Sequence, residues 1–158
     1  NRKISTEEEL EVWLLLSQVR KELLMASDRE LKKRFGVSTV QLGILYALNK
    51  AAESGIAPSI SDLARSILRK HNTVSVILAG MEKRGLIKME RSNEGKRSVT
   101  VHITEEGQNV FEAIEAKRKN IKEIIGILSA RERRQLITLL QKLDRQAREI
   151  LFKIPFSQ

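Results

Sequence analysis

Cysteine is absent from the 158 residues of this chain. Disulfide bonds, thiol-based redox sensing and cysteine-ligated zinc sites are therefore excluded. Because the chain has only two histidines, His71 and His102, we expect no dedicated transition-metal site and no cofactor. Apolar runs stay well short of the roughly 20 residues that a membrane-spanning helix needs, and no secretory signal is visible. These absences predict a cytoplasmic protein without a membrane partner.

The residue patterns of common enzymes are missing as well. The sequence has no Gly-rich phosphate-binding loop, no Ser-His-Asp or Cys-His arrangement, and no pair of carboxylates in a cleft-like context. We therefore expect that the chain is not an enzyme and has no catalytic residues.

Positive charge is abundant and unevenly distributed. The chain carries 29 lysines and arginines against 20 acidic residues, which gives a formal net charge of +9. Residues 59–103 contribute +5 of this excess, residues 1–58 contribute +1, and residues 104–158 contribute +3. Many soluble proteins are basic without binding nucleic acid, but a basic excess concentrated on one segment favours a polyanion as partner.

The basic segment has the pattern of two helices followed by a β-hairpin. Residues 86–91 and 98–103 flank a charged loop at 92–97, and the second of these runs alternates polar and apolar residues as a strand does. We expect this unit to be a winged helix-turn-helix, with one helix in the major groove of DNA and the hairpin on the flanking backbone or minor groove. Apolar residues recur at helical spacing in two sets, Ile60, Leu63, Ala64, Ile67 and Leu68, then Val74, Ile77, Leu78 and Met81.

Capping signals delimit further helices on both sides. Capping boxes are formed by Ser5 with Glu8, Ser38 with Gln41, and Ser129 with Glu132. Ser59 or Ser61 is expected to cap the first helix of the basic segment, and Gly85 to end the second. Thr104 is expected to cap one continuous helix that extends as far as Leu128. The fold class is therefore mainly α with a small β-hairpin wing (α+β).

The last helix carries a heptad-like apolar seam. In a monomer this seam would expose a large apolar patch, so we expect a homodimer joined through the terminal helices. Packing of the last helix on the first within one chain is the alternative. We assign residues 36–103 to the DNA-binding lobe and residues 1–35 plus 104–158 to a discontinuous helical dimerisation region. The seam consists of Leu136, Leu140, Leu143, Ala147, Ile150 and Ile154.

The second helix of the motif, expected at about residues 71–84, would present its exposed face to DNA. Asn72 can pair with adenine, Thr and Ser can reach bases or phosphates, and Val76 and Ala79 can contact a thymine methyl group. Basic side chains would hold phosphates, and the wing would lie on the minor groove or its edge. His102 is expected on the wet face of a strand. The predicted DNA-binding residues are Arg65, Arg69, Lys70, His71, Asn72, Thr73, Ser75, Val76, Ala79, Lys88, Arg91, Lys96 and Arg97.

Two strings resemble the MarR family of transcription regulators. Residues 81–87, Met-Glu-Lys-Arg-Gly-Leu-Ile, look like the end of that family's recognition helix. Residues 96–107 look like the returning wing strand and the Thr-x-x-Gly start of the next helix. The family commonly has Asp-x-Arg at the wing tip; here Arg97 is kept but Gly95 stands at the Asp position, which leaves Glu94 or Asn93 to orient the arginine.

The resemblance implies a dimeric transcriptional repressor that binds double-stranded DNA. It would read a palindromic operator with half-site centres about 10 bp apart. It also implies release by a small-molecule effector, bound where the dimer helices meet the DNA-binding lobe. Trp13, Arg20, Tyr46 and Phe111 are candidates to line that pocket, with ordinary core packing as the alternative. The competing function is a winged-helix protein–protein interaction module without sequence-specific DNA binding.

Overall fold

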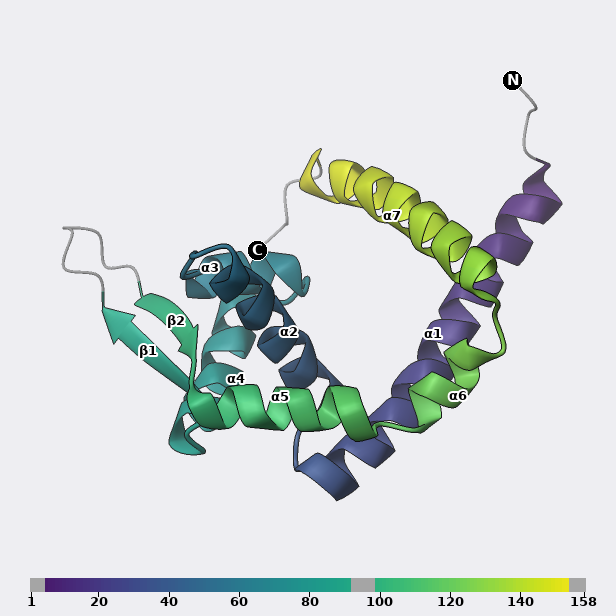
Figure 1. The fold of residues 1–158 in the computed structure, drawn as a ribbon. Helices are drawn as coiled ribbons and strands as arrows, with labels where there is room; N and C mark the ends of the chain where they lie inside the picture. The colour runs from purple at the N-terminus through teal and green to yellow at the C-terminus, as the bar shows by residue number, and fades with distance from the viewer. Residues whose placement is uncertain (1–4, 92–98, 154–158) are drawn as a thin grey trace. The chain divides into compact units, whose positions relative to one another are not determined.

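The computed structural model describes residues 5–91 and 99–153 of the chain. The predicted class, mainly α with a β-hairpin wing, is confirmed. Two compact units are formed by residues 1–120 and 121–158, and no described helix is long and apolar enough to cross a membrane. The elements are α1 (Thr6–Phe35), α2 (Thr39–Glu53), α3 (Ile60–Ser66), α4 (His71–Lys83), β1 (Ile87–Arg91), β2 (Val99–Ile103), α5 (Glu105–Lys117), α6 (Asn120–Gly126) and α7 (Ala130–Lys153) (Figure 1).

Helix starts follow the capping residues of the sequence. Ser5 and Ser38 each accept the backbone N–H three residues later while the side chain at that position bonds back, which confirms both capping boxes. Ser59, rather than Ser61, caps α3 in the same way with Asp62. Ser129 forms the corresponding pair of hydrogen bonds with Glu132. These side chains satisfy backbone N–H groups that the first helical turn leaves unpaired.

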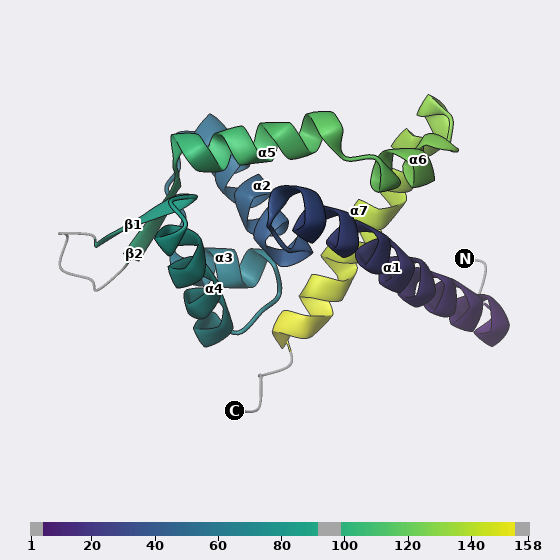
Figure 2. The ribbon, with the colours of Figure 1, turned by 90° about the horizontal axis from the view of Figure 1, so that it is seen from below.

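The core of the first unit is built around α2. This helix contacts α1, α3, α5 and β2, and it lies between α5 on one side and α3 on the other (Figure 2). Its buried side chains belong to one continuous core cluster to which α1, α3, α4, α5 and both strands also contribute, and this core supports the whole helix-turn-helix. The largest fully buried residues are Leu31, Ile44, Leu45, Leu48, Leu63, Leu78, Met81, Ile87, Ile114, Val37, Val74 and Val101.

The prediction of a single helix from Thr104 to Leu128 is wrong. The helix is interrupted between Lys117, where α5 ends, and Asn120, where α6 begins. The Glu30 carboxylate on α1 accepts the N–H groups of Lys119 at 2.8 Å and Asn120 at 3.0 Å. Arg34, also on α1, donates to the carbonyl of Lys117 at 2.8 Å. Backbone groups that would have continued the helix are thus bonded to α1 side chains, a tertiary arrangement that helical periodicity does not report.

Leu68 also departs from expectation. α3 ends at Ser66, and Leu68 lies in the turn before α4 with φ of 52° and a side chain that is 47% exposed. It therefore does not extend the apolar face of α3. A leucine in the left-handed region carries backbone strain, since its Cβ crowds the neighbouring peptide.

The hairpin is antiparallel, with Ile87 opposite Ile103 and Met89 opposite Val101. On its β2 side, the N–H of Val101 donates to the Pro58 carbonyl at 2.9 Å, and residues 59 and 100 form an isolated bridge. The start of α3 therefore covers the outer edge of β2.

Candidate nucleic-acid interface

α4 has one fully buried face and one exposed face. Val74, Leu78 and Met81 are completely buried, as their spacing predicts, and Ile77 is half-buried. On the opposite side Val76 is 75% exposed. The helix therefore presents a row of small, mostly uncharged side chains outwards. The predicted contact residues His71, Asn72, Thr73 and Ala79 are all exposed, and Ser75 is half-buried.

Basic side chains surround the start of α4. Arg65 is exposed on α3, and Arg69 and Lys70 are exposed in the segment that leads into α4. Lys70 is the N-cap residue of α4 and makes no side-chain capping bond there. Positive charge at this helix end, together with the unpaired backbone N–H groups of the first turn, favours a phosphate.

The hairpin carries two further predicted contacts. Lys88 is exposed, but its ammonium lies 2.6 Å from the Glu90 carboxylate. The hydrogen bond with Glu90 raises the pKa of Lys88 and lowers that of Glu90, so this lysine is charged yet already paired. Arg91 is exposed at the end of β1. The predicted wing-tip contacts Lys96 and Arg97, with Gly95, Glu94 and Asn93, lie outside the described residues.

His102, directly opposite Lys88, is half-buried on β2, and its Nε2 lies 3.3 Å from the Thr100 hydroxyl and 3.7 Å from Glu90.

The Thr-x-x-Gly string, Thr104 to Gly107, joins the start of α5 to the turn between α4 and β1 through hydrogen bonds. Thr104 donates its hydroxyl to the Gly85 carbonyl at 2.6 Å and accepts the Gly107 N–H at 3.0 Å. A Cβ on Gly107 would lie 2.0 Å from the carbonyl oxygen of Leu86. Gly107 is therefore required by close backbone approach, and Gly85 by its φ of 73°.

Two residues near the C-terminal end of α4 have contacts that sequence reasoning missed. Arg84 donates to the Gly36 carbonyl at 2.7 Å, which ties this end of α4 to the turn between α1 and α2. Glu82 accepts the N–H of Met89 on β1 at 2.7 Å. The Arg84 contact spans 48 residues, and the Glu82 contact joins a helix to the strand that follows it. Both bond a side chain to a backbone group of another element, which helical spacing rules do not predict.

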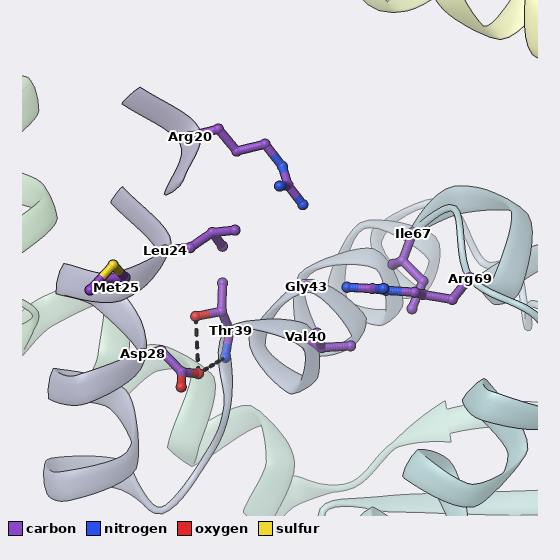
Figure 3. Close-up of a pocket in the computed structure, with 9 residues that line it drawn as sticks. All are labelled: Arg20, Leu24, Met25, Asp28, Thr39, Val40, Gly43, Ile67 and Arg69. Carbon is purple, nitrogen blue, oxygen red and sulfur yellow. Dashed lines mark hydrogen bonds between the residues drawn. The ribbon is translucent and has the colours of Figure 1, made fainter. Parts of the chain in front are cut away.

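A pocket of about 440 Å³ lies among α1, α2 and the segment before α4. The guanidinium groups of Arg20 and Arg69 extend towards each other from opposite sides of it (Figure 3). Leu24, Met25, Val40 and Ile67 supply apolar wall, and Gly43 leaves room. The pocket therefore combines two cations with an apolar lining.

Asp28, the acidic residue that lines this pocket, is already engaged. Its carboxylate contacts Lys32 at 2.6 Å and accepts the Thr39 N–H at 3.1 Å. The hydrogen bond from Lys32, followed by that from Thr39, holds the pKa of Asp28 below its ordinary value. Because the charge of Asp28 is paired with Lys32, the two arginines make the electrostatic potential inside the pocket positive.

The four predicted effector-pocket residues do not gather in one place. Arg20 lines the pocket just described, but Trp13, Tyr46 and Phe111 are not among its lining residues. Trp13 is 63% exposed on α1. The rings of Tyr46 and Phe111 contact each other with centroids 6.4 Å apart, and Phe111 belongs to the core.

The terminal helices carry extensive uncovered apolar surface. α7 has no buried residue, and Leu136, Leu140, Leu143 and Ile150 of the predicted seam are between 38% and 52% exposed. Ala147 is exposed too, and Ile154 lies outside the described residues. On α1, seven apolar residues between positions 10 and 19 are exposed, and they point in all directions around the helix.

The chain is similar to the MarR family model and to known HTH-type transcriptional regulators. Residues 35–98 match the model of the MarR family. The chain is 27% identical over 146 residues to the uncharacterized HTH-type transcriptional regulator YfiV of Bacillus subtilis, covering 92% of this chain and 88% of that protein. It is 24% identical over 140 residues to the HTH-type transcriptional repressor MdtR of the same organism, covering 88% and 84%.

Solved structures share the fold. AbsC, a MarR family transcriptional regulator from Streptomyces coelicolor, superposes with a TM-score of 0.74 at 20% identity, covering 94% of this chain and 99% of that one. MepR of S. aureus in complex with DNA gives 0.69 at 21% identity, covering 85% and 96%. BpsR of Bordetella bronchiseptica, whose DNA binding is regulated by 6-hydroxynicotinic acid, gives 0.71 at 20% identity, covering 85% and 98%.

Proposed function

From the match of residues 35–98 to the MarR family model, we propose that the protein is a MarR-type regulator, a dimeric, sequence-specific DNA-binding repressor. The observation that carries the proposal is the outward face of α4. Asn72, Thr73 and Val76 are exposed there, while the other face of the same helix is anchored in the core. A rigid helix that displays short polar and methyl-bearing side chains, flanked by Arg69 and Lys70, has the chemistry of a major-groove reader.

Each side chain has a proposed role. Asn72 pairs with adenine, Val76 and Ala79 contact thymine methyl groups, and Thr73 and Ser75 reach bases or phosphates. Backbone phosphates are held by Arg65, Arg69, Lys70, His71 and Arg91. Lys88 contributes less, because Glu90 already neutralises it at 2.6 Å. Lys96 and Arg97 are proposed to lie on the minor groove.

The homodimer is proposed to form through α1 and α7. A helix with apolar residues on every side is normally buried on every side, and residues 10–19 of α1 have that composition. α7 adds an amphipathic stripe of its own. A second copy with the same two helices would cover these surfaces, and its twofold symmetry would set two α4 helices about 10 bp apart on the duplex.

Selection of duplexes from a random pool, followed by affinity measurement, tests the proposal. We expect an inverted repeat bound by a dimer, with an affinity that falls steeply as salt rises. Asn72→Ala should weaken operator binding by about 1–3 kcal/mol and relax the preference at one base pair. Asn109→Ala removes the same chemical group from an exposed site on α5 and should change neither. If the wild type binds no duplex in dilute buffer, the proposed function is wrong.

A small organic anion is the proposed effector, bound in the pocket between Arg20 and Arg69. Two facing guanidinium groups fit a carboxylate, and the apolar wall fits its body. Because Arg69 is also a proposed phosphate contact, effector and DNA would compete for it, which gives the coupling a direct cause. With 6-hydroxynicotinate as the probe, we expect release of operator from the wild type. Arg20→Ala should keep operator binding but lose the release; equal release from both proteins would refute this pocket.

A further inference from the structure

We infer that Glu82 is the positioning residue that holds the hairpin at a fixed orientation to α4, so that the two DNA-reading elements meet the duplex as one rigid body. This role of Glu82 rests on the proposed DNA-binding function. It explains why the hairpin keeps a fixed orientation to α4 when the protein binds DNA. Glu82 is half-buried in the last turn of α4, and its Oε1 accepts the N–H of Met89 at 2.7 Å.

Among the described residues, the N–H of Met89 lies on the edge of β1 that has no strand partner. Met89 is opposite Val101, and the N–H of Val101 points away from β1 to the Pro58 carbonyl. In an antiparallel pair whose residues do not exchange hydrogen bonds, both N–H groups point outwards. The Met89 N–H therefore points to the outer edge of β1, where Glu82 accepts it. Without Glu82 this strand edge would lose its side-chain partner.

The two sides of the hairpin are attached differently. β2 is held to the start of α3 by backbone groups, namely the 2.9 Å bond to Pro58 and the bridge between residues 59 and 100. β1 is held to α4 by the covalent turn through Gly85, by the burial of Ile87 in the core that α4 shares, and by the Glu82 side chain. A backbone bond survives most substitutions, so the bond from Met89 to Glu82 is the hydrogen bond between hairpin and helix that a single side chain controls.

A carboxylate suits this task better than a neutral group. Hydrogen bonds to a charged acceptor are shorter and about twice as strong as those between neutral groups, and a stiff bond limits rocking of β1 against α4. Within the described part of the chain no ion pair of Glu82 competes for its oxygens. An acidic side chain on α4 repels DNA phosphates, so its charge weakens binding unless it organises the interface.

The consequence for binding concerns the exposed cations of the hairpin, Lys88 and Arg91. Their phosphate contacts depend on where β1 lies when α4 is seated in the groove. If β1 is free to rock, ordering it on DNA costs entropy at the moment of binding. Glu82 removes that cost beforehand without touching DNA itself.

The test compares Glu82→Gln with Glu82→Ala by hydroxyl-radical footprinting and affinity on the selected operator. Both variants remove the same negative charge, but Gln retains an oxygen that can accept the Met89 N–H. We expect Glu82→Gln to keep the wild-type footprint. Glu82→Ala should keep protection over the half-site centres, lose it on the flanks reached by the hairpins, and bind about tenfold more weakly than Glu82→Gln, which equals about 1.4 kcal/mol.

Glu82→Asp supplies a second comparison that keeps the charge and shortens the reach by one methylene. It should lose flank protection as Glu82→Ala does, and it decides the question if the alanine variant does not fold. Amide exchange at Met89 gives an independent readout, with faster exchange expected in Ala and Asp than in Gln or wild type. Identical footprints and affinities for all folded variants would overturn the inference. A wild type that binds no duplex would instead overturn the proposed function.

Discussion

Replacement of Gly107 by alanine should destabilise the protein, whereas the same replacement at Gly43 should stabilise it. Both glycines are helical, at the start of α5 and inside α2. A Cβ on Gly107 would lie 2.0 Å from the Leu86 carbonyl oxygen and 3.0 Å from Cγ1 of Ile103, while a Cβ on Gly43 meets nothing within 4 Å. The two sites therefore separate helix propensity from steric conflict.

The magnitudes follow from these distances. In a helix interior alanine is favoured over glycine by about 0.5–1 kcal/mol, which is the gain expected for Gly43→Ala. At Gly107 the obstacle is backbone, which cannot rotate away, and overpacking of this kind costs about 1–3 kcal/mol. Moving the Leu86 carbonyl also strains the bond that it accepts from the Thr104 N–H at 3.2 Å, which is worth a further ~1 kcal/mol. Subtracting the gain of about 0.5–1 kcal/mol that alanine brings to a helix leaves an expected net loss of about 1–3.5 kcal/mol.

Urea denaturation of the two variants and the wild type, at one protein concentration, measures both effects. Each kcal/mol should also move the melting temperature by about 2–4 °C in a chain of this size. The reasoning is refuted if Gly107→Ala is as stable as the wild type, because the close approach of α5 to Leu86 would then be absent.

Four further substitutions, at three positions, probe the framework, all by denaturant unfolding. Burial raises the pKa of Glu30, but the N–H groups of Lys119 and Asn120 together with Arg34 lower it more, so it lies below its ordinary 4.5. Its stabilisation is thus present above pH 4.5 and lost as pH falls through the native pKa, and Glu30→Gln should flatten the decline in stability between about pH 6 and pH 3. Leu68→Gly should relieve its positive φ and stabilise by about 0.5–1 kcal/mol, whereas Leu68→Val should destabilise. Thr104→Ala should cost about 1 kcal/mol through its two lost hydroxyl bonds; no change would contradict the junction described here.

Local rules predicted most helix starts and the faces of α4. Ser5, Ser38 and Ser129 each sit three residues before a Glu or Gln, and each forms a capping box with it. The burial of Val74 and Leu78 follows from helical periodicity alone. These features involve residues within one helical turn or face, so the sequence contains all the information that they need.

Features that join distant segments were not predictable in this way. The break after Lys117 depends on Glu30, almost ninety residues earlier in the chain, and the pocket depends on the approach of Arg20 to Arg69. Arg84 and Glu82 bond to backbone groups that any residue type would offer. Side-chain identity therefore gives no indication of the partner.

The sequence by itself determined where most helices begin, which face of α4 is apolar, and that positive charge is concentrated on residues 59–103, because these properties depend on spacing and composition along the chain. The tertiary structure decided how the hairpin is attached to α4, where α5 gives way to α6, and which cations share a pocket. Those outcomes depend on hydrogen bonds and packing between different helices and strands, whose distances are set only once the α2-centred core has formed.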